Sequence, residues 1–271
     1  MITRRKSTAL WSVLALAWGA LALVACGGEK AGDNAATAAA PAEGSAAPAP
    51  AAAAGPTGTA TVAGTATYEG DVPKLKPVSM SADPTCASKH TGDVPSDVLV
   101  LGPAKELANV FIYVKEGLPD ATWAPPATPV TIDQNGCLYH PHVVGVVVGQ
   151  KLDFLNSDGL LHNVHALPNV NQEFNIAMPA ERKSAEHTFE QAEGMFNVKC
   201  DVHPWMTAYV GVLKHPFFAV SGTDGKANIA NLPAGTYTIE AWHEKLGSQT
   251  QQVTVTDGGT ASVNFVFKRP A

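Results

Sequence analysis

A cysteine, a histidine and a methionine are evenly spaced in the stretch KCDVHPWMTAYVGV, residues 199–212. In a helix, Cys200, His203 and Met206 would spread over roughly a third of the circumference. Pro204 argues against a helix, because the residue before a proline is pushed out of the α region. His203 is therefore expected in a loop between the strand-like segments on either side. Three metal-binding side chains would then lie on one tight loop.

This donor set indicates the metal. Thiolate, thioether and imidazole favour copper, and two histidines, one cysteine and a weak axial methionine form blue-copper electron-transfer sites. A second histidine is therefore needed, and NSDGLLHNVHALPN, residues 156–169, contains His162 and His165. In an extended segment these two side chains point to opposite faces, so only one of them faces the Cys200 loop. Catalytic zinc is the alternative, but zinc has little use for the Met206 thioether.

The order and spacing of these residues resemble a known family. HNVH upstream and CDVHPWM downstream are similar to the copper-binding pattern of the cupredoxins, and the short C-x-x-H-x-x-M loop resembles that of the amicyanins. Plastocyanins place more residues between the second histidine and the methionine. The resemblance covers residues 128–214. It implies one type 1 copper ion with the ligands His162, Cys200, His203 and Met206.

The same resemblance implies roles for the neighbouring residues. Asn163 is expected to bridge the two ligand loops, and His165 to face away from the metal. His203 is expected to present its outer imidazole edge to a redox partner protein, through an apolar docking patch that includes Pro204 and Trp205; core packing is the alternative role of Trp205.

The cysteines in DPTCASKH and QNGCLYHPH have two interpretations. In an oxidising compartment Cys86 and Cys137 are expected to form a disulfide. The alternative is a second metal site, because Cys86, His90, Cys137 and His140 have ligand-like spacings, and His140 and His142 share a face of any strand. CASKH is not a C-x-x-C-H haem attachment motif. The remaining histidines, His187, His215 and His243, are interpreted as structural or surface residues.

The pattern of apolar and polar residues along the chain predicts an all-β protein. Short apolar or alternating runs recur between Gly, Pro, Asn and Asp residues, and only residues 181–192 have a composition that suits a helix. We expect a Greek-key cupredoxin β-sandwich at 128–214, flanked by smaller β-sandwich-like segments. Residues 215–271, with TDGK as an expected hairpin turn followed by LPAGTYTIEAW, resemble a carboxypeptidase-regulatory-like or transthyretin-like β-sandwich. Residues 59–127 resemble such a module more faintly.

The first residues of the chain predict where the protein is located. MITRRKSTALWSVLALAWGALALVACGG has a basic start and an apolar run that is short for a membrane span. It is typical of an export signal, residues 1–25, and the run before Cys26 resembles the lipobox of bacterial lipoproteins. Cys26 is then the lipidated first residue of the mature chain. Residues 26–58 are mostly Ala, Pro and Gly and are expected to form a disordered tether with a span of roughly 30 Å.

These features predict an electron-transfer protein anchored by lipid at the periplasmic side of the bacterial envelope, on the outer membrane. A net charge of −6 with little clustering of Lys and Arg argues against nucleic acid as a partner. Nucleophile elbows, phosphate loops and persuasive carboxylate pairs are lacking in the sequence, which indicates a protein that is not an enzyme. A red copper enzyme would need a carboxylate ligand, and Glu173 is too remote in sequence to assign. The alternative function is a copper carrier or a surface-binding β-module.

Overall fold

The computed structural model describes residues 55–269. The predicted signal 1–25, the lipidation site Cys26 and most of the predicted tether 26–58 lie outside the described residues. Within the described range, helices long and apolar enough to span a membrane are absent. The strands build β-sandwiches, which confirms the predicted all-β fold class.

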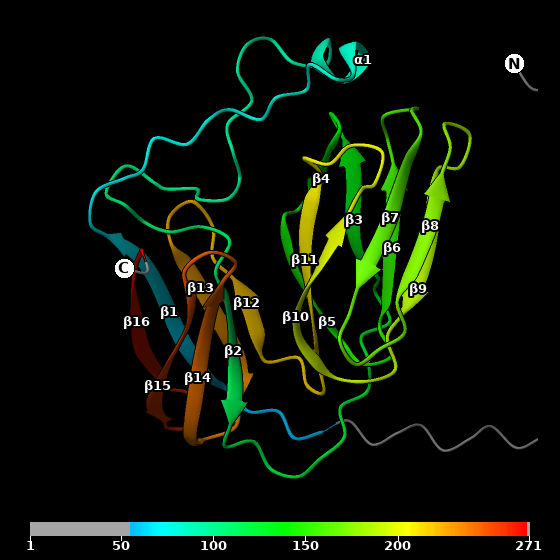
Figure 1. The fold of residues 1–271 in the computed structure, drawn as a ribbon. Helices are drawn as coiled ribbons and strands as arrows, with labels where there is room; N and C mark the ends of the chain where they lie inside the picture. Colours follow the sequence, from blue (N-terminus) through cyan, green and yellow to red (C-terminus); the bar gives the residue numbers. More distant parts are fainter. Residues whose placement is uncertain (1–54, 270–271) are drawn as a thin grey trace, which may run out of the picture. The chain divides into compact units, whose positions relative to one another are not determined.

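The central part of the chain forms the first sandwich, which we call the central sandwich (Figure 1). Its five-stranded sheet has the order β5 (Val143–Val147), β11 (Thr207–Leu213), β10 (Glu193–Lys199), β7 (His162–Leu167) and β8 (Phe174–Met178). Its four-stranded sheet has the order β4 (Leu138–His140), β3 (Val130–Asn135), β6 (Lys151–Asn156) and β9 (Ser184–Thr188). Pairing is antiparallel except between β5 and β11 and between β3 and β6.

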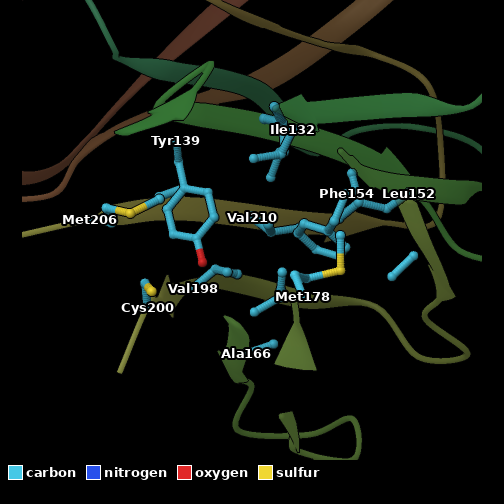
Figure 2. Packing of buried hydrophobic residues seen from close by; sticks show 14 of the residues in the cluster. Ile132, Tyr139, Leu152, Phe154, Ala166, Met178, Val198, Cys200, Met206 and Val210 are labelled. Carbon is cyan, nitrogen blue, oxygen red and sulfur yellow. The ribbon is translucent and has the colours of Figure 1, made fainter. Parts of the chain in front are cut away.

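Alternation along the strands builds the core between these two sheets. In β6, Leu152 and Phe154 are fully buried while Lys151 is exposed, as a period of two residues requires. Figure 2 shows Phe154 and Leu152 at one end of the core, and Tyr139 with Cys200 and Met206 at the other. The sulfur-bearing side chains therefore belong to the same packed core that holds the sheets together.

The second sandwich is built from both ends of the described chain. One sheet has the order β13 (Lys226–Leu232), β1 (Ala60–Glu69) and β16 (Thr260–Lys268), and the other β12 (Phe218–Val220), β2 (Phe111–Glu116), β14 (Gly235–His243) and β15 (Gly247–Val255). β1 pairs with β13 and β16, and β2 pairs with β12 and β14. Residues 59–127 and 215–268 therefore share one core, and the structure corrects the expected division into separate flanking segments.

β5 shows how closely the two sandwiches pack within this compact unit. All five of its residues are buried, so both of its faces must be covered. Val144 and Val146 face the core of the central sandwich. On the other face, a Cβ at Gly145 would come within 2.5 Å of Phe218 and 2.6 Å of Phe111. Glycine at this position permits the rings of the second sandwich to touch the strand.

Two local expectations were wrong. Residues 181–192 do not form a helix, because Ser184–Thr188 pairs with β6 as strand β9. The turn TDGK does form, with Gly225 at a φ of 70°. It joins β12 and β13, which lie in different sheets, so it is not the turn of a paired hairpin. The helix in the described range is the short α1 (Pro84–Ala87), capped by Asp83.

His142 lies between the two sandwiches and is buried. Its Nε2 is 2.6 Å from Glu244 Oε1, and its Nδ1 is 3.0 Å from Asp97 Oδ2 and 3.0 Å from the Thr207 carbonyl oxygen. Burial alone lowers the pKa of His142, but the hydrogen bonds to Asp97 and Glu244 outweigh it and raise the pKa to about 9. The imidazolium is therefore held in place as part of the packing between sandwiches. These contacts differ from those expected of His142 as a ligand in the second metal site.

This arrangement predicts a pH-dependent stability. The pKa of His142 is raised above its unfolded value of about 6.5, so its contribution is complete below that pH and is lost as the pH rises through about 9. The contribution is expected to reach up to about 3 kcal/mol. Urea unfolding of the metal-free protein at about pH 6 and about pH 10 measures it, as the difference between parent and His142→Gln.

His187→Gln is the matched control, because His187 packs on Phe174 and its pKa is lowered by burial alone. Its difference from the parent is expected to lack this loss at high pH. An equal parent-to-variant difference for His142→Gln at both pH values would contradict the assigned ion pair.

Candidate metal centre

Two loops at one end of the central sandwich carry the predicted ligands. His162 is the first residue of β7, and Cys200 follows the last residue of β10. The chain then turns back, with the Met206 amide donating to the His203 carbonyl at 2.9 Å and the Cys200 amide to the Met206 carbonyl at 3.2 Å. β10 ends at Lys199 and β11 begins at Thr207, so three of the predicted ligands lie in the short turn between these two strands.

The donor atoms converge on one point. The Nδ1 atoms of His162 and His203 are 2.9 Å apart, and Cys200 Sγ is 3.8 Å from His203 Nδ1. The three donor atoms lie within 4.8 Å of one another. Metal bonds of about 2.0 Å to nitrogen and about 2.3 Å to sulfur place two nitrogens roughly 2.8–3.3 Å apart, and a nitrogen and sulfur roughly 3.5–3.9 Å apart. The spacing therefore fits a single ion.

The donors are shielded from water. His162, Cys200, His203 and Met206 are each at most 2% exposed. Burial raises the pKa of the Cys200 thiol, but hydrogen bonds from His162 and from backbone groups outweigh it and leave the pKa below its usual value. A low thiol pKa favours the thiolate, which is the form that binds metals. Burial likewise lowers the pKa of His162, and hydrogen bonds to Asp158 and Cys200 raise it to about 9.

Asn163 joins the two ligand loops in the structure. Its Oδ1 accepts from the Asp201 amide at 2.6 Å and the Val202 amide at 3.4 Å, and its Nδ2 donates to Asn175 Oδ1 at 2.6 Å. Since Asn163 follows His162 and Asp201 follows Cys200, this side chain fixes the spacing of the two ligands. Beneath them, the Tyr139 hydroxyl donates to the Asn163 carbonyl at 2.6 Å.

His165 points to the opposite face of β7 from His162. Its Nδ1 is 2.8 Å from Asp201 Oδ2, and its Nε2 is 2.8 Å from Glu173 Oε1. Glu173 therefore contacts His165 and is not part of the converging donor group.

A carboxylate lies behind each ligand histidine, and sequence reasoning missed both. Asp158 Oδ2 is 3.0 Å from His162 Nε2, and Asp83 Oδ2 is 3.1 Å from His203 Nε2. The sequence around Asp83 did indicate a helix start, because an Asp before a Pro is typical of one. The sequence around Asp158 gave no such indication, because the role of this carboxylate depends on a fold that turns it inward four residues before the ligand.

The structure corrects the expected position of the outer edge of His203. The imidazole is 2% exposed, and its Nε2 faces Asp83 and lies 3.5 Å from Cys86 Sγ. The segment around α1 therefore covers the edge that was expected to meet a partner. Pro204 is exposed, but Trp205 is half-buried and its Nε1 donates to the Cys137 carbonyl at 3.0 Å.

Cys86 and Cys137 form a disulfide with a Cα–Cα distance of 5.6 Å. Of the other residues considered for a second metal site, His90 places Nε2 2.7 Å from the Gly136 carbonyl oxygen, and His140 is exposed. His215 and His243 pack beside aromatic rings, and burial lowers the pKa of each to about 4. Both side chains serve packing.

Comparisons with known proteins locate one family match. Residues 207–268 match the model of the carboxypeptidase regulatory-like domain. These residues run from β11 to β16, so the match begins in the central sandwich and does not include β1 or β2. Among proteins with curated descriptions, no match to this sequence was found.

Solved structures similar to part of this chain are cupredoxins. A Cu-containing nitrite reductase (NirK) from Thermus scotoductus is 20% identical at a TM-score of 0.30, over 37% of this chain and 26% of the reductase. A reduced Cu(I) amicyanin variant is 26% identical at a TM-score of 0.28, over 33% of this chain and 91% of the amicyanin. A purple cupredoxin from Nitrosopumilus maritimus is 24% identical at a TM-score of 0.26, over 31% of this chain and 98% of that protein.

Proposed function

We propose that this chain is a type 1 copper-binding electron-transfer protein of the bacterial envelope. The observation that carries the proposal is the convergence of two imidazole Nδ1 atoms and one thiol Sγ within 4.8 Å, in a buried site. Copper bound there would supply a one-electron change of oxidation state. In this proposal Cys200 provides the thiolate, His162 and His203 the imidazoles, and Met206 the weak axial thioether.

The scaffold suits a site whose ligands move little between oxidation states. Each ligand is tied to its surroundings, by Asn163 across the loops, by the closing bonds of the turn, and by a carboxylate behind each imidazole. Rigid ligands reduce the rearrangement that accompanies electron transfer. A set of four protein ligands also leaves no position for a substrate, unlike a catalytic metal site, so the proposed role is non-catalytic.

The proposal includes anchoring and a partner. Cys26, after an export signal, would carry the lipid, and residues 26–58 would tether the sandwiches at the periplasmic side of the outer membrane. The proposed partner is a redox protein and not a nucleic acid, given the net charge of −6. Because α1 covers His203, such a partner would have to receive the electron by a route other than the bare imidazole edge.

The burial of His203 beneath the segment around α1 favours a second candidate function, a copper carrier or store. A buried His203 edge limits electron exchange with a partner, and a store does not need that exchange. The two functions differ in how the protein releases its metal. A carrier exchanges copper readily with a chelator, whereas an electron-transfer protein holds it through many redox cycles.

Copper loading of the purified chain tests the proposal. We expect one equivalent of copper, an intense visible band in the oxidised protein that bleaches on reduction, and reversible one-electron electrochemistry. Slow loss of copper to a chelator over the same period supports electron transfer. A colourless copper form would reject the type 1 site, and rapid loss to the chelator without a reversible redox wave would favour the carrier.

A further inference from the structure

Both ligand histidines have a carboxylate on the nitrogen that faces away from the donor cluster. For His162 it is Asp158, at 3.0 Å, and for His203 it is Asp83, at 3.1 Å. The Nδ1 atoms of the same rings face each other across the site. A carboxylate accepts only from an N–H, so each pair keeps a proton on Nε2, and Nδ1 is the ring nitrogen that can give its lone pair to a metal.

Asp158 is held rigidly. Its side chain is 1% exposed, and its two oxygens accept from the Gly136 amide at 2.8 Å, the Cys137 amide at 2.7 Å and Lys89 Nζ at 3.1 Å, besides His162. The carboxylate cannot swing away, because each oxygen has two donors. Asp83 is 33% exposed, and its Oδ1 caps α1 through the Thr85 and Cys86 amides.

We propose that Asp158 and Asp83 are positioning residues that fix the ligand imidazoles and lower the reduction potential of bound copper. This inference rests on the proposed type 1 copper site. A negative charge behind an imidazole makes the ring a stronger donor and favours the more highly charged ion, Cu(II), over Cu(I). The effect of Asp158 is the larger, since a buried charge is screened less than a partly exposed one.

The matched control is another buried carboxylate. Glu193 is 9% exposed and accepts from the backbone amides of Asn169, Val170 and Asn171 at the far end of β10 from Cys200. Glu193→Gln removes a buried charge and disturbs a turn without touching a ligand. A general effect of charge or stability on the potential would appear in this variant too.

Two variants test the proposal, and they differ in how well they are expected to fold. Asp83→Ser keeps a residue that caps helices well but whose side chain is too short to reach His203, so α1 is retained. Asp158→Asn keeps the shape but turns an amide NH2 toward a pair of donors, which threatens folding. Asp83→Ser therefore decides the question even where Asp158→Asn does not fold.

Voltammetry of the copper-loaded full chain gives the readout. Asp158→Asn is expected to change the ratio of Cu(II) to Cu(I) affinity about tenfold, which raises the potential by about 59 mV for one electron. Asp83→Ser is expected to shift the potential in the same direction by less, and Glu193→Gln to match the parent. The melting temperature and visible band of each variant, measured beside those of the parent, show that the proteins compared are folded and loaded with copper.

The outcomes separate the two proposals. A coloured parent with unshifted or lowered potentials in Asp83→Ser, and in Asp158→Asn where it folds, overturns this inference and leaves the copper site standing. A parent without the copper band overturns the proposed function and this inference together. A rise in potential in Asp83→Ser, and in Asp158→Asn where it folds, but not in Glu193→Gln, supports it.

Discussion

Cys200→Ser is expected to abolish the visible absorption of the copper-loaded protein. A hydroxyl is a far weaker donor to copper than a thiolate, and the intense band of a type 1 site needs the thiolate. Loss of a partner outside the coordination shell already costs about 10–100-fold in metal affinity, so loss of the ligand itself is expected to cost more than about 100-fold. Absorption spectra and copper content after desalting measure both effects.

The β-fold is expected to survive this substitution. Cys200 lies at the edge of a core whose bulk is formed by side chains such as Phe154, Val198 and Val210 (Figure 2). Circular dichroism of the metal-free variant checks this. Val202→Ser is the matched control, because Val202 lies on the same loop but is exposed and has no donor atom. A Cys200→Ser protein that keeps the parent's band would reject the ligand assignment.

The ligand loop was the most predictable part of the site because its information is local. Pro204 and the apolar runs on both sides specify a turn between two strands without reference to any distant residue. His162 required the family resemblance, since alternation alone leaves His162 and His165 equivalent. The structure separates them through contacts of His165 with Asp201 and Glu173, on the other face of β7.

The cover over His203 was not predictable from pattern. Asp83 and His203 are 120 residues apart, and the segment that carries Asp83 contains only isolated β-bridges and one short helix. Such a segment lacks the periodicity from which position can be inferred. The resemblance to cupredoxins suggested an exposed imidazole edge because it covers residues 128–214 and therefore does not include α1.

The second sandwich was misdivided for a related reason. Alternation identified β1 and β16 as strands, but a strand pattern does not name its partner. Thr61 pairs in parallel with Thr260, across almost the whole described chain. Pairing of this kind depends on the complete core, to which Val62 of β1 and Phe265 of β16 both belong. Sequence predicts such elements more readily than the domain that they share.

Removal of the Cys86–Cys137 disulfide is expected to give the largest loss of stability among these substitutions. The bridge spans 51 residues and links α1 to the turn between β3 and β4. In the chain-entropy model a loop of this length contributes about 4 kcal/mol. For a unit of this size that corresponds to a fall in melting temperature of roughly 8–16 °C. Thermal unfolding of metal-free Cys86→Ala/Cys137→Ala against the parent measures the loss.

The copper band of this double variant is expected to stay nearly intact, because Cys200 is not part of the bridge. Copper should nevertheless leave faster to a chelator, since the bridge holds α1 against the outer nitrogen of His203.

A dithiol reductant should lower the parent's melting temperature and leave that of the double variant unchanged, which separates loss of the bridge from loss of two buried sulfurs. Alkylation of both cysteines in unreduced parent protein, read by mass spectrometry, would contradict the disulfide itself. An unchanged rate of copper loss in the double variant would show that the bridge does not control access to His203.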